Sequence, residues 1–401
     1  MKTFCILFLC VIFVSCEAGK KEKIESENNL ELNDNLIKDK TIEALRRADS
    51  VLSEMTVEQK VGLLFMPAID SRFNVETEEE IKRLIYDLHV GGILFMNGDT
   101  ESVIHLSEFC RKVKPGLFSA IDAEWGLKMR LRDAPSFPKN GSFDINADES
   151  LLYDYGREVA LQCRNIGINL VLGPVLDVAD NSHSNIGKRS YGKDPKRVAD
   201  LGIAYAKGLE SGGVLTVAKH FPGLGNLTED THKSKGVLKK DLSAFRNTEF
   251  YPFAKYIDSG LSGIMVGYQA VPALDNTMTP SAFSYSVITE ILKDSLDFKG
   301  LVFTDALNMK GAEGFTSTDA LLAGADIILS PKDSQAECMS VIRSISEGLI
   351  SLNKIEESGR KILFFRFMLD DDKVYPKGLS DPAIRQISSE LSEKLINKNT
   401  E

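Results

Sequence analysis

An aspartate and a histidine stand two positions apart in Asp230-Thr231-His232. In an extended segment, side chains two residues apart point to the same side, so Asp230 can accept a hydrogen bond from Nδ1–H of His232 and leave Nε2 free for proton transfer. A histidine with a pKa of about 6.5 suits general acid and base catalysis at neutral pH. The competing interpretation is a surface pair in a polar loop, which is the commoner role of such a pattern.

Six further polar residues stand at or next to the carboxyl ends of apolar, β-rich runs. Parallel barrels build their active sites at this end of their strands, so the shared position indicates a site. Taken singly, each residue is more often a turn or cap residue, because a chain must turn where an apolar run ends. The six are Asp122, Asp177, Lys219, His220, Tyr268 and Asp305.

The elements that must position these residues are short β-rich runs alternating with segments of helical period. The runs cover 61–66, 91–96, 116–122, 168–177, 215–221, 263–268, 300–305 and 326–330. Helical spacing fills 78–88, 102–113, 151–166, 197–209, 242–257, 286–296, 335–348 and 352–365. Strand and helix repeated eight times predict an α/β fold, a parallel (β/α)8 TIM barrel over residues 42–370. Thr56 and Gln59 have capping-box spacing and predict a short helix before the first strand.

Several motifs resemble those of glycoside hydrolase family 3, in particular its single-domain bacterial β-N-acetylglucosaminidases. The resemblance extends from Met55 to about Pro331. It rests on Lys219-His220-Phe221-Pro222-Gly223 followed by Asp230-Thr231-His232, on Ile121-Asp122-Ala123-Glu124 with Arg130, on Gly187-Lys188-Arg189-Ser190-Tyr191-Gly192, and on Phe303-Thr304-Asp305-Ala306-Leu307-Asn308-Met309. A set in this order is far more specific than any single motif.

The resemblance implies roles for individual residues. It makes Asp305 the nucleophile that forms a glycosyl-enzyme, and His232, oriented by Asp230, the general acid and base. It also implies a retaining β-N-acetylhexosaminidase that removes terminal β-linked N-acetylglucosamine from peptidoglycan fragments or related oligosaccharides. The residues that match positions holding the terminal sugar are Asp122, Arg130, Arg189, Lys219 and His220.

The chain departs from the family pattern at four positions. Leu224 and Asn226 replace a usual His and Asp, Trp125 replaces Gly, and Tyr268 replaces His. Trp125 fits either a stacking wall for a sugar or a packing role under the rim. These departures affect the expected aglycone preference more than the expected chemistry.

Two alternative functions stay open. One is a β-glucosidase or β-xylosidase of the same family, although these usually take their acid from an additional domain, for which the 70 or so residues after Pro331 are too few. The other is a catalytically silent sugar-binding lipoprotein, whose mark would be loss of the nucleophile or the dyad. Phosphate could also replace water as the acceptor, since a neutral histidine repels an anion less than a glutamate does.

The first residues have the order of an export signal. Lys2 precedes an apolar run too short to span a bilayer, and Phe13-Val14-Ser15-Cys16 resembles the lipobox of bacterial lipoproteins. We therefore expect a signal peptide over 1–15, a lipid on Cys16, a charged flexible tether over 16–41, and an exported protein anchored to the membrane on its periplasmic or cell-surface side. An ordinary secretory signal with an incidental cysteine is the alternative.

Composition limits the partners further. The formal net charge of −10 over 401 residues disfavours nucleic acid. Cys110, Cys163 and Cys338 lack metal-ligand spacing and five histidines form no ligand cluster, so we expect buried thiols, no metal and no cofactor. The expected partner is an oligosaccharide with terminal N-acetylglucosamine, bound by a monomer. Residues 371–401 carry a helical pattern and form a tail of no assigned role.

Overall fold

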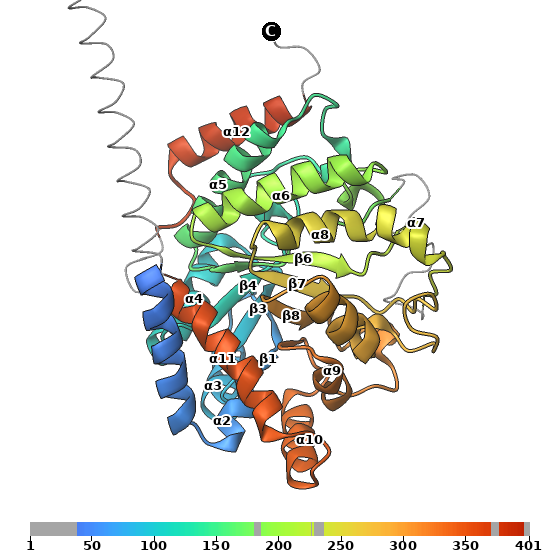
Figure 1. The fold of residues 1–401 in the computed structure, drawn as a ribbon. Coiled ribbons are helices and arrows are strands. Elements are labelled where there is room, and N and C mark those ends of the chain that lie inside the picture. Colours follow the sequence, from blue (N-terminus) through green and yellow to red (C-terminus); the bar gives the residue numbers. More distant parts are fainter. Residues whose placement is uncertain (1–37, 180–185, 226, 228–235, 370–376, 397–401) are drawn as a thin grey trace, which may run out of the picture.

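The computed structural model describes residues 38–179, 186–225, 227, 236–369 and 377–396. Cys16, Asp230 and His232 lie outside these residues. The described strands are all parallel and form a seven-stranded sheet and a two-stranded sheet (Figure 1). They are β1 (Phe65–Met66), β2 (Ala68–Asp70), β3 (Gly92–Met96), β4 (Phe118–Ile121), β5 (Leu170–Val171), β6 (Leu215–Phe221), β7 (Gly263–Val266), β8 (Leu301–Thr304) and β9 (Ile328–Leu329).

The two sheets together close as a barrel. Strands β2 to β8 pair in chain order, and β9 pairs with β1 in the register Phe65↔Ile328. A bridge between Phe303 and Ile327 joins β8 to the segment that leads into β9. Because β1 and β2 are one strand interrupted at Pro67, which has no N–H to donate, the ring has eight members and the predicted (β/α)8 barrel is confirmed.

Two predicted strand runs differ from the observed strands. In the run 61–66, Val61 and Gly62 belong to the helix α2, and the strand lies further along at 65–70. In the run 168–177, only Leu170 and Val171 are β-strand. The sequence Gly173-Pro174 follows them, and a proline removes a donor from the ladder.

Helices surround the barrel, and a helix over 38–54 precedes it, so residues 38–41, which were expected to belong to the flexible tether, are helical. The others are α2 (Val57–Gly62), α3 (Val75–Tyr86), α4 (Thr100–Val113), α5 (Glu149–Asn165), α6 (Pro195–Ser211), α7 (Leu242–Asn247), α8 (Phe250–Asp258), the π-helix η5 (Ser286–Ser295), α9 (Ser317–Ala323), α10 (Ser334–Ser346), α11 (Leu352–Met368) and α12 (Pro382–Ile396). The predicted capping box is present at α2, where Thr56 and Gln59 bond each other's backbone N–H. None of the described helices is both long and apolar enough to span a membrane.

The predicted helix 242–257 is broken into α7 and α8. Between them Glu249 turns inward, where it is buried and accepts hydrogen bonds of 3.0 Å from Lys240 Nζ to both carboxylate oxygens. Glu249 packs under Gly223, where an added Cβ would lie 2.7 Å from the Glu249 Cβ. The break therefore places a buried ion pair beneath the turn that follows β6.

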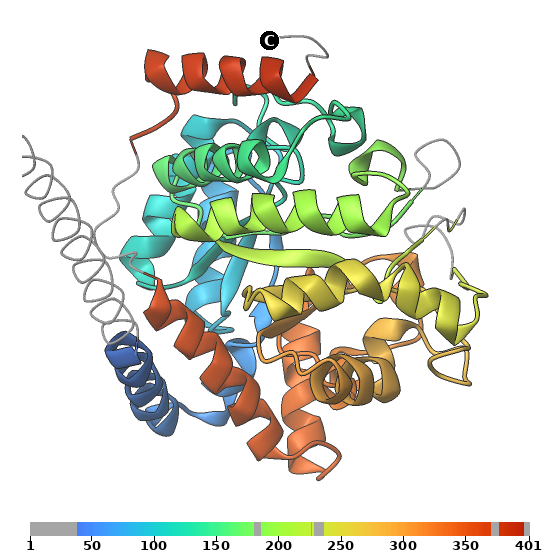
Figure 2. The same ribbon diagram turned by 45° about the horizontal axis from the view of Figure 1, so that its top comes forward.

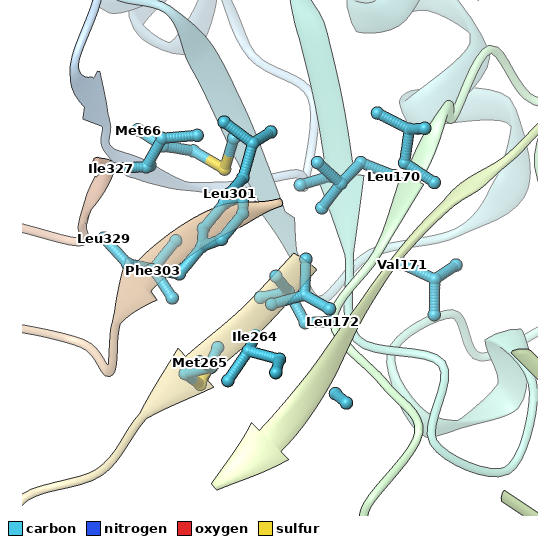
Figure 3. Packing of buried hydrophobic residues seen from close by; sticks show 14 of the residues in the cluster. Met66, Leu170, Val171, Leu172, Ile264, Met265, Leu301, Phe303, Ile327 and Leu329 are labelled. Atoms are coloured by element: carbon cyan, nitrogen blue, oxygen red, sulfur yellow. The ribbon is translucent and has the colours of Figure 1, made fainter. Parts of the chain in front are cut away.

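Close backbone approaches fix the outer layer. A Cβ added to Gly156 in α5 would lie 2.2 Å from the carbonyl oxygen of Tyr205 in α6, and one added to Gly208 would lie 2.2 Å from that of Tyr153. These glycines let α5 and α6 lie in contact, and α12 lies across α5 (Figure 2). Inside the barrel, apolar side chains such as Met66, Leu301 and Phe303 fill the interior, so the barrel is a packed core (Figure 3).

Candidate active site

Neighbouring strands deliver the candidate residues to one end of the barrel. Asp122 follows β4, and Asp305 follows β8. Lys219 and His220 lie near the carboxyl end of β6, and Tyr268 lies two residues past β7. Because parallel strands end on the same side, all five stand at the carboxyl-terminal mouth.

Lys219 and His220 are consecutive, yet both side chains are buried at this mouth. Consecutive residues of a regular strand point to opposite faces. The pairing of β6 with β7 shifts register between Lys219 and Phe221. The strand is therefore irregular where both side chains meet the site.

One half of the site is an ion-pair chain through Lys219. Its Nζ lies 2.7 Å from Asp122 Oδ1 and 2.8 Å from Glu124 Oε1. The other oxygen of Asp122 accepts from Arg130, whose Nε lies 3.1 Å away and whose Nη2 also donates. Lys219 thus holds two buried carboxylates in fixed positions.

The other half continues from Glu124 through Arg189. The guanidinium binds Glu124 through both Nε and Nη2, each at 2.8 Å, in a bidentate pair. Arg189 Nη2 also lies 3.4 Å from His220 Nε2, and His220 Nδ1 lies 2.7 Å from Asp177 Oδ2. A carboxylate accepts, so Nδ1 carries hydrogen and Nε2 turns its lone pair to Arg189.

The second oxygen of Asp177 is also bonded. It accepts from the backbone N–H of Leu224 at 2.7 Å and from that of His220 at 3.3 Å. Asp177 is fully buried, and it ties the turn after β6 to the loop after β5. The site is therefore one continuous network from Arg130 to Asp177.

The network keeps its charged groups ionised. Burial alone would raise the pKa of Asp122 and that of Glu124. The adjacent cations lower each pKa by more than burial raises it, so both pKa values lie below the usual range of a carboxyl group. Burial alone would lower the pKa of Lys219, yet these two carboxylates raise it above its usual value. The Arg189 pKa is likewise raised, because Glu124 outweighs burial. Such a fixed array can present charged donors and acceptors to the hydroxyls of a sugar without reorganising.

Asp305 is half-buried and bonded mainly through its backbone. Its Oδ1 accepts from the N–H of Ala306 at 2.7 Å, and its own N–H donates to the carbonyl of Val266 at 3.0 Å. The hydroxyl of Tyr268 donates to the Asp305 carbonyl at 2.8 Å. Tyr268 is buried and stacks on Phe283 at 5.6 Å, so this hydroxyl is held in place.

The structure brings together all five residues expected to hold the sugar, in the single network described above. The positions expected for the dyad, Asp230 and His232, lie outside the described residues. Sequence reasoning gave no role to Glu124, which joins Lys219 to Arg189, or to Asn140, whose Nδ2 donates to the Arg189 carbonyl at 2.7 Å. Glu124 stood two residues after Asp122, and that spacing on one extended segment was the available signal.

Two departures from the family pattern acquire physical meaning. Leu224 is buried in a small apolar cluster with Val175, Ala179, Ile186 and Leu227, so the polar side chain expected there is replaced by packing. Trp125 is partly exposed, and Lys139 Nζ lies 5.2 Å from the centre of its ring.

The three cysteines of the described chain are buried free thiols, as predicted.

Comparison with known proteins gives a consistent family. Residues 56–364 match the family described as Glycosyl hydrolase family 3 N terminal domain. The chain is 33% identical over 273 residues to the protein named Beta-hexosaminidase of Nitrosomonas eutropha. The aligned region covers 64% of this chain and 78% of that protein.

Two solved structures extend the comparison. A glycoside hydrolase family 3 beta-N-acetylglucosaminidase from a Paenibacillus species superposes with a TM-score of 0.77 at 27% identity, covering 85% of this chain and 69% of that one. A Beta-N-acetylhexosaminidase from Beutenbergia cavernae superposes with a TM-score of 0.69 at 25% identity, covering 77% and 98%.

Proposed function

The chain belongs to glycoside hydrolase family 3, and from this premise we propose that it is a retaining β-N-acetylhexosaminidase that releases terminal β-linked N-acetylglucosamine. One observation carries the proposal. An acidic side chain, Asp305, follows β8 at the mouth of the barrel, and the network from Arg130 to Asp177 stands at the same mouth. The relatives' names supply the sugar class.

Each residue has a part in the reaction. The network Arg130, Asp122, Lys219, Glu124, Arg189 and His220 holds the hydroxyls of the terminal sugar. Asp305 then attacks the anomeric carbon as the bond to the leaving oxygen breaks, which forms a covalent glycosyl-enzyme. His232, oriented by Asp230, protonates the leaving oxygen and afterwards takes a proton from the water that attacks the intermediate. Two inversions at one carbon retain its configuration.

The natural substrate in this proposal is a peptidoglycan fragment or a related oligosaccharide. The argument comes from location. The signal at 1–15, the lipid on Cys16 and the tether over 16–41 would hold the barrel outside the cytoplasm, where such fragments are released.

The direct test is trapping of the intermediate. A 5-fluoro β-N-acetylglucosaminide analogue with a good leaving group keeps the acetamido group at C2 and slows the second step, so peptide mass spectrometry should find the sugar on Asp305. Aryl glycosides measure the sugar preference. We expect faster release of nitrophenol from the β-N-acetylglucosaminide than from the β-glucoside or β-xyloside. Faster release from either of those would reassign the activity within the family, and no release from any of them would favour the silent binding protein.

Replacement of the nucleophile supplies the kinetic test. Asp305→Asn keeps the size of the side chain and removes the attacking carboxylate, so kcat should fall by about 10⁴-fold or more. Asp258→Asn, on the exposed surface of α8, is the matched control and should keep the parental kcat. An Asp305→Asn enzyme within tenfold of the parent contradicts the assignment.

A further inference from the structure

A second pocket lies at the opposite end of the barrel from Asp305. It has a volume of about 470 Å³ and is lined by the helix over 38–54, by the segments that lead into β3 and β4, and by the end of α11. Figure 1 shows that helix and α11 close together on one side of the barrel. Its lining residues include Arg47, Val51, Met55, Lys114, Arg366 and Phe367.

Two cations are fixed in this pocket by backbone carbonyls alone. Lys114 Nζ donates to the carbonyl of His89 at 2.9 Å and to that of Val90 at 3.0 Å. Arg366 Nη2 donates to the carbonyl of Gly91, and the guanidinium lies 5.5 Å from the centre of the Phe118 ring. Carbonyl dipoles satisfy hydrogens, but they do not cancel a full charge.

The positive charge of the pocket has no counterpart among its lining residues. None of the described residues that line it is acidic, while Arg47, Lys114 and Arg366 are basic and His89 stands beside them. The Nε of Arg366 is buried and no described atom accepts its hydrogen. Lys114 has three N–H donors and uses two. The third N–H of Lys114 is therefore available to an anion, and the buried Nε of Arg366 is an unsatisfied donor beside it.

Burial strengthens the case for a missing anion. It lowers the pKa of Lys114 to about 7, to which the nearby Arg366 contributes, and it lowers the pKa of Arg366 to about 10. Paired cations normally have raised pKa values, as Lys219 has in the active site. An anion in the pocket would relieve the cost of burying both charges.

Apolar side chains make up much of the rest of the wall, beside Gln59. Val51 lies one turn after Arg47 on the same face of the helix over 38–54, and Met55 follows the last residue of that helix. The centre of the Phe367 ring lies 4.1 Å from the Arg47 guanidinium carbon. The volume falls within the usual range for small-molecule sites, roughly 300–1,000 Å³. We propose that this pocket binds an anionic amphiphile, with a carboxylate or phosphate head on Lys114 and Arg366 and a short acyl chain along Val51 and Met55.

Calorimetry with matched probes tests the proposal on the chain over 16–401, which contains every described residue and carries no lipid. Octanoate should bind, while acetate, which lacks the chain, and 1-octanol, which lacks the charge, should each bind at least about 10-fold more weakly. Octyl phosphate distinguishes the head groups, because its affinity relative to octanoate shows whether a phosphate or a carboxylate is preferred. Absence of octanoate binding at millimolar concentration overturns the proposal.

Two variants locate the binding. Lys114→Gln should weaken octanoate binding by about 10- to 100-fold, since it removes a charge-assisted hydrogen bond. Lys112→Gln, two residues earlier on α4, is the matched control and should leave affinity unchanged. Equal affinity of Lys114→Gln and the parent protein refutes the site.

Val51→Glu is the second test of the site, and it applies even if Lys114→Gln fails to fold. Val51 is 41% exposed, so the longer side chain has room to place its own carboxylate at the pocket. That carboxylate should raise the melting temperature and weaken octanoate binding together. Val75→Glu, on α3 at 72% exposure, should change neither. A Val51→Glu protein with unchanged octanoate affinity also contradicts the proposal.

Discussion

Asp305 differs from the other carboxylates of the site in its partners. Asp122 and Glu124 each accept from two cations, and Asp177 accepts from an imidazole. Within the described ranges, no cation lies within 4.0 Å of the Asp305 carboxylate, whose Oδ1 accepts from the backbone N–H of Ala306. A carboxylate neutralised by a guanidinium is a poor nucleophile. The paired carboxylates of the network therefore suit sugar binding, and Asp305 suits nucleophilic attack.

Tyr268 is expected to position Asp305 rather than to touch the sugar. Tyr268→Phe removes the hydroxyl that donates to the Asp305 carbonyl and keeps the stacked ring. One neutral hydrogen bond is worth about 0.5–1.5 kcal/mol, so kcat should fall about 2- to 10-fold with KM nearly constant. Steady-state kinetics beside Tyr285→Phe, an exposed control at 56%, measure this. A change confined to KM would assign Tyr268 to substrate binding instead.

The dyad is expected to behave as one unit. If Asp230 acts only by orienting His232, then the double replacement by Ala should lose no more kcat/KM than the larger single loss. Leaving groups separate the roles further. Nitrophenolate departs with little protonation, so His232→Ala should lose less on the aryl glycoside than on a disaccharide, whose alkoxide requires a proton.

Kinetics of the two single variants and the double variant on both substrates decide the matter. Additive losses, together with equal losses on aryl glycoside and disaccharide, would move the acid to another residue. Asp241→Ala, the N-cap of α7, controls for loss of an aspartate elsewhere in the fold.

At the scale of elements, α12 is held on α5 by a small polar cluster inside an apolar contact. Ser388 Oγ and Gln162 Nε2 both donate to Glu158 Oε1, at 3.0 and 2.9 Å. Ile384, Leu391 and Leu395 of α12 are buried around it. Burial raises the pKa of Glu158, because the two hydrogen bonds compensate only in part.

This shift predicts how the stability of the protein depends on pH. Glu158 binds its proton more tightly in the folded chain than in the unfolded chain, where the pKa is about 4.3. Its contribution is therefore most favourable below pH 4.3 and is lost as pH rises through the folded pKa. Glu158→Gln keeps the shape without the charge, so it should raise the urea midpoint at pH 7 more than at pH 4. Glu393→Gln, exposed on α12, should show no such difference, and an equal gain at both pH values would contradict the assignment.

The boundaries of elements were predicted well where pattern alone decides them. The runs at β6 to β8 lie within a few residues of their predicted bounds, since each is a short run buried throughout. The helices α4, α5, α6 and α11 do so too, since each has an apolar face and a capping side chain. The break at Glu249 was not predictable, because Thr248 and Glu249 are unexceptional in a helix. The break is stabilised by Lys240, whose contact forms only in the folded chain.

At the scale of the whole molecule, the active-site network and the pocket of Lys114 and Arg366 lie at opposite ends of the barrel. The order of strands fixed the mouth and so the neighbourhood of Asp122, Lys219 and Asp305, which is why a sequence could predict that these residues gather. It could not predict the alternation of charge through Glu124, or the uncompensated Lys114 and Arg366, because both depend on side-chain contacts between distant segments.

The predicted attachment of the protein to a membrane depends on one residue, Cys16. If Cys16 carries a lipid, the protein expressed in its bacterial host should enter the detergent phase of a Triton X-114 separation, and Cys16→Ala should enter the aqueous phase or retain its uncleaved signal. Cys10→Ala, within the apolar run, is the matched control and should partition like the parent. Intact mass of the detergent-phase protein separates a lipid on Cys16 from an uncleaved signal, since only the former begins at Cys16. A parental protein found in the aqueous phase, with its signal removed at another bond, would instead show an ordinary secreted enzyme that has no lipid anchor.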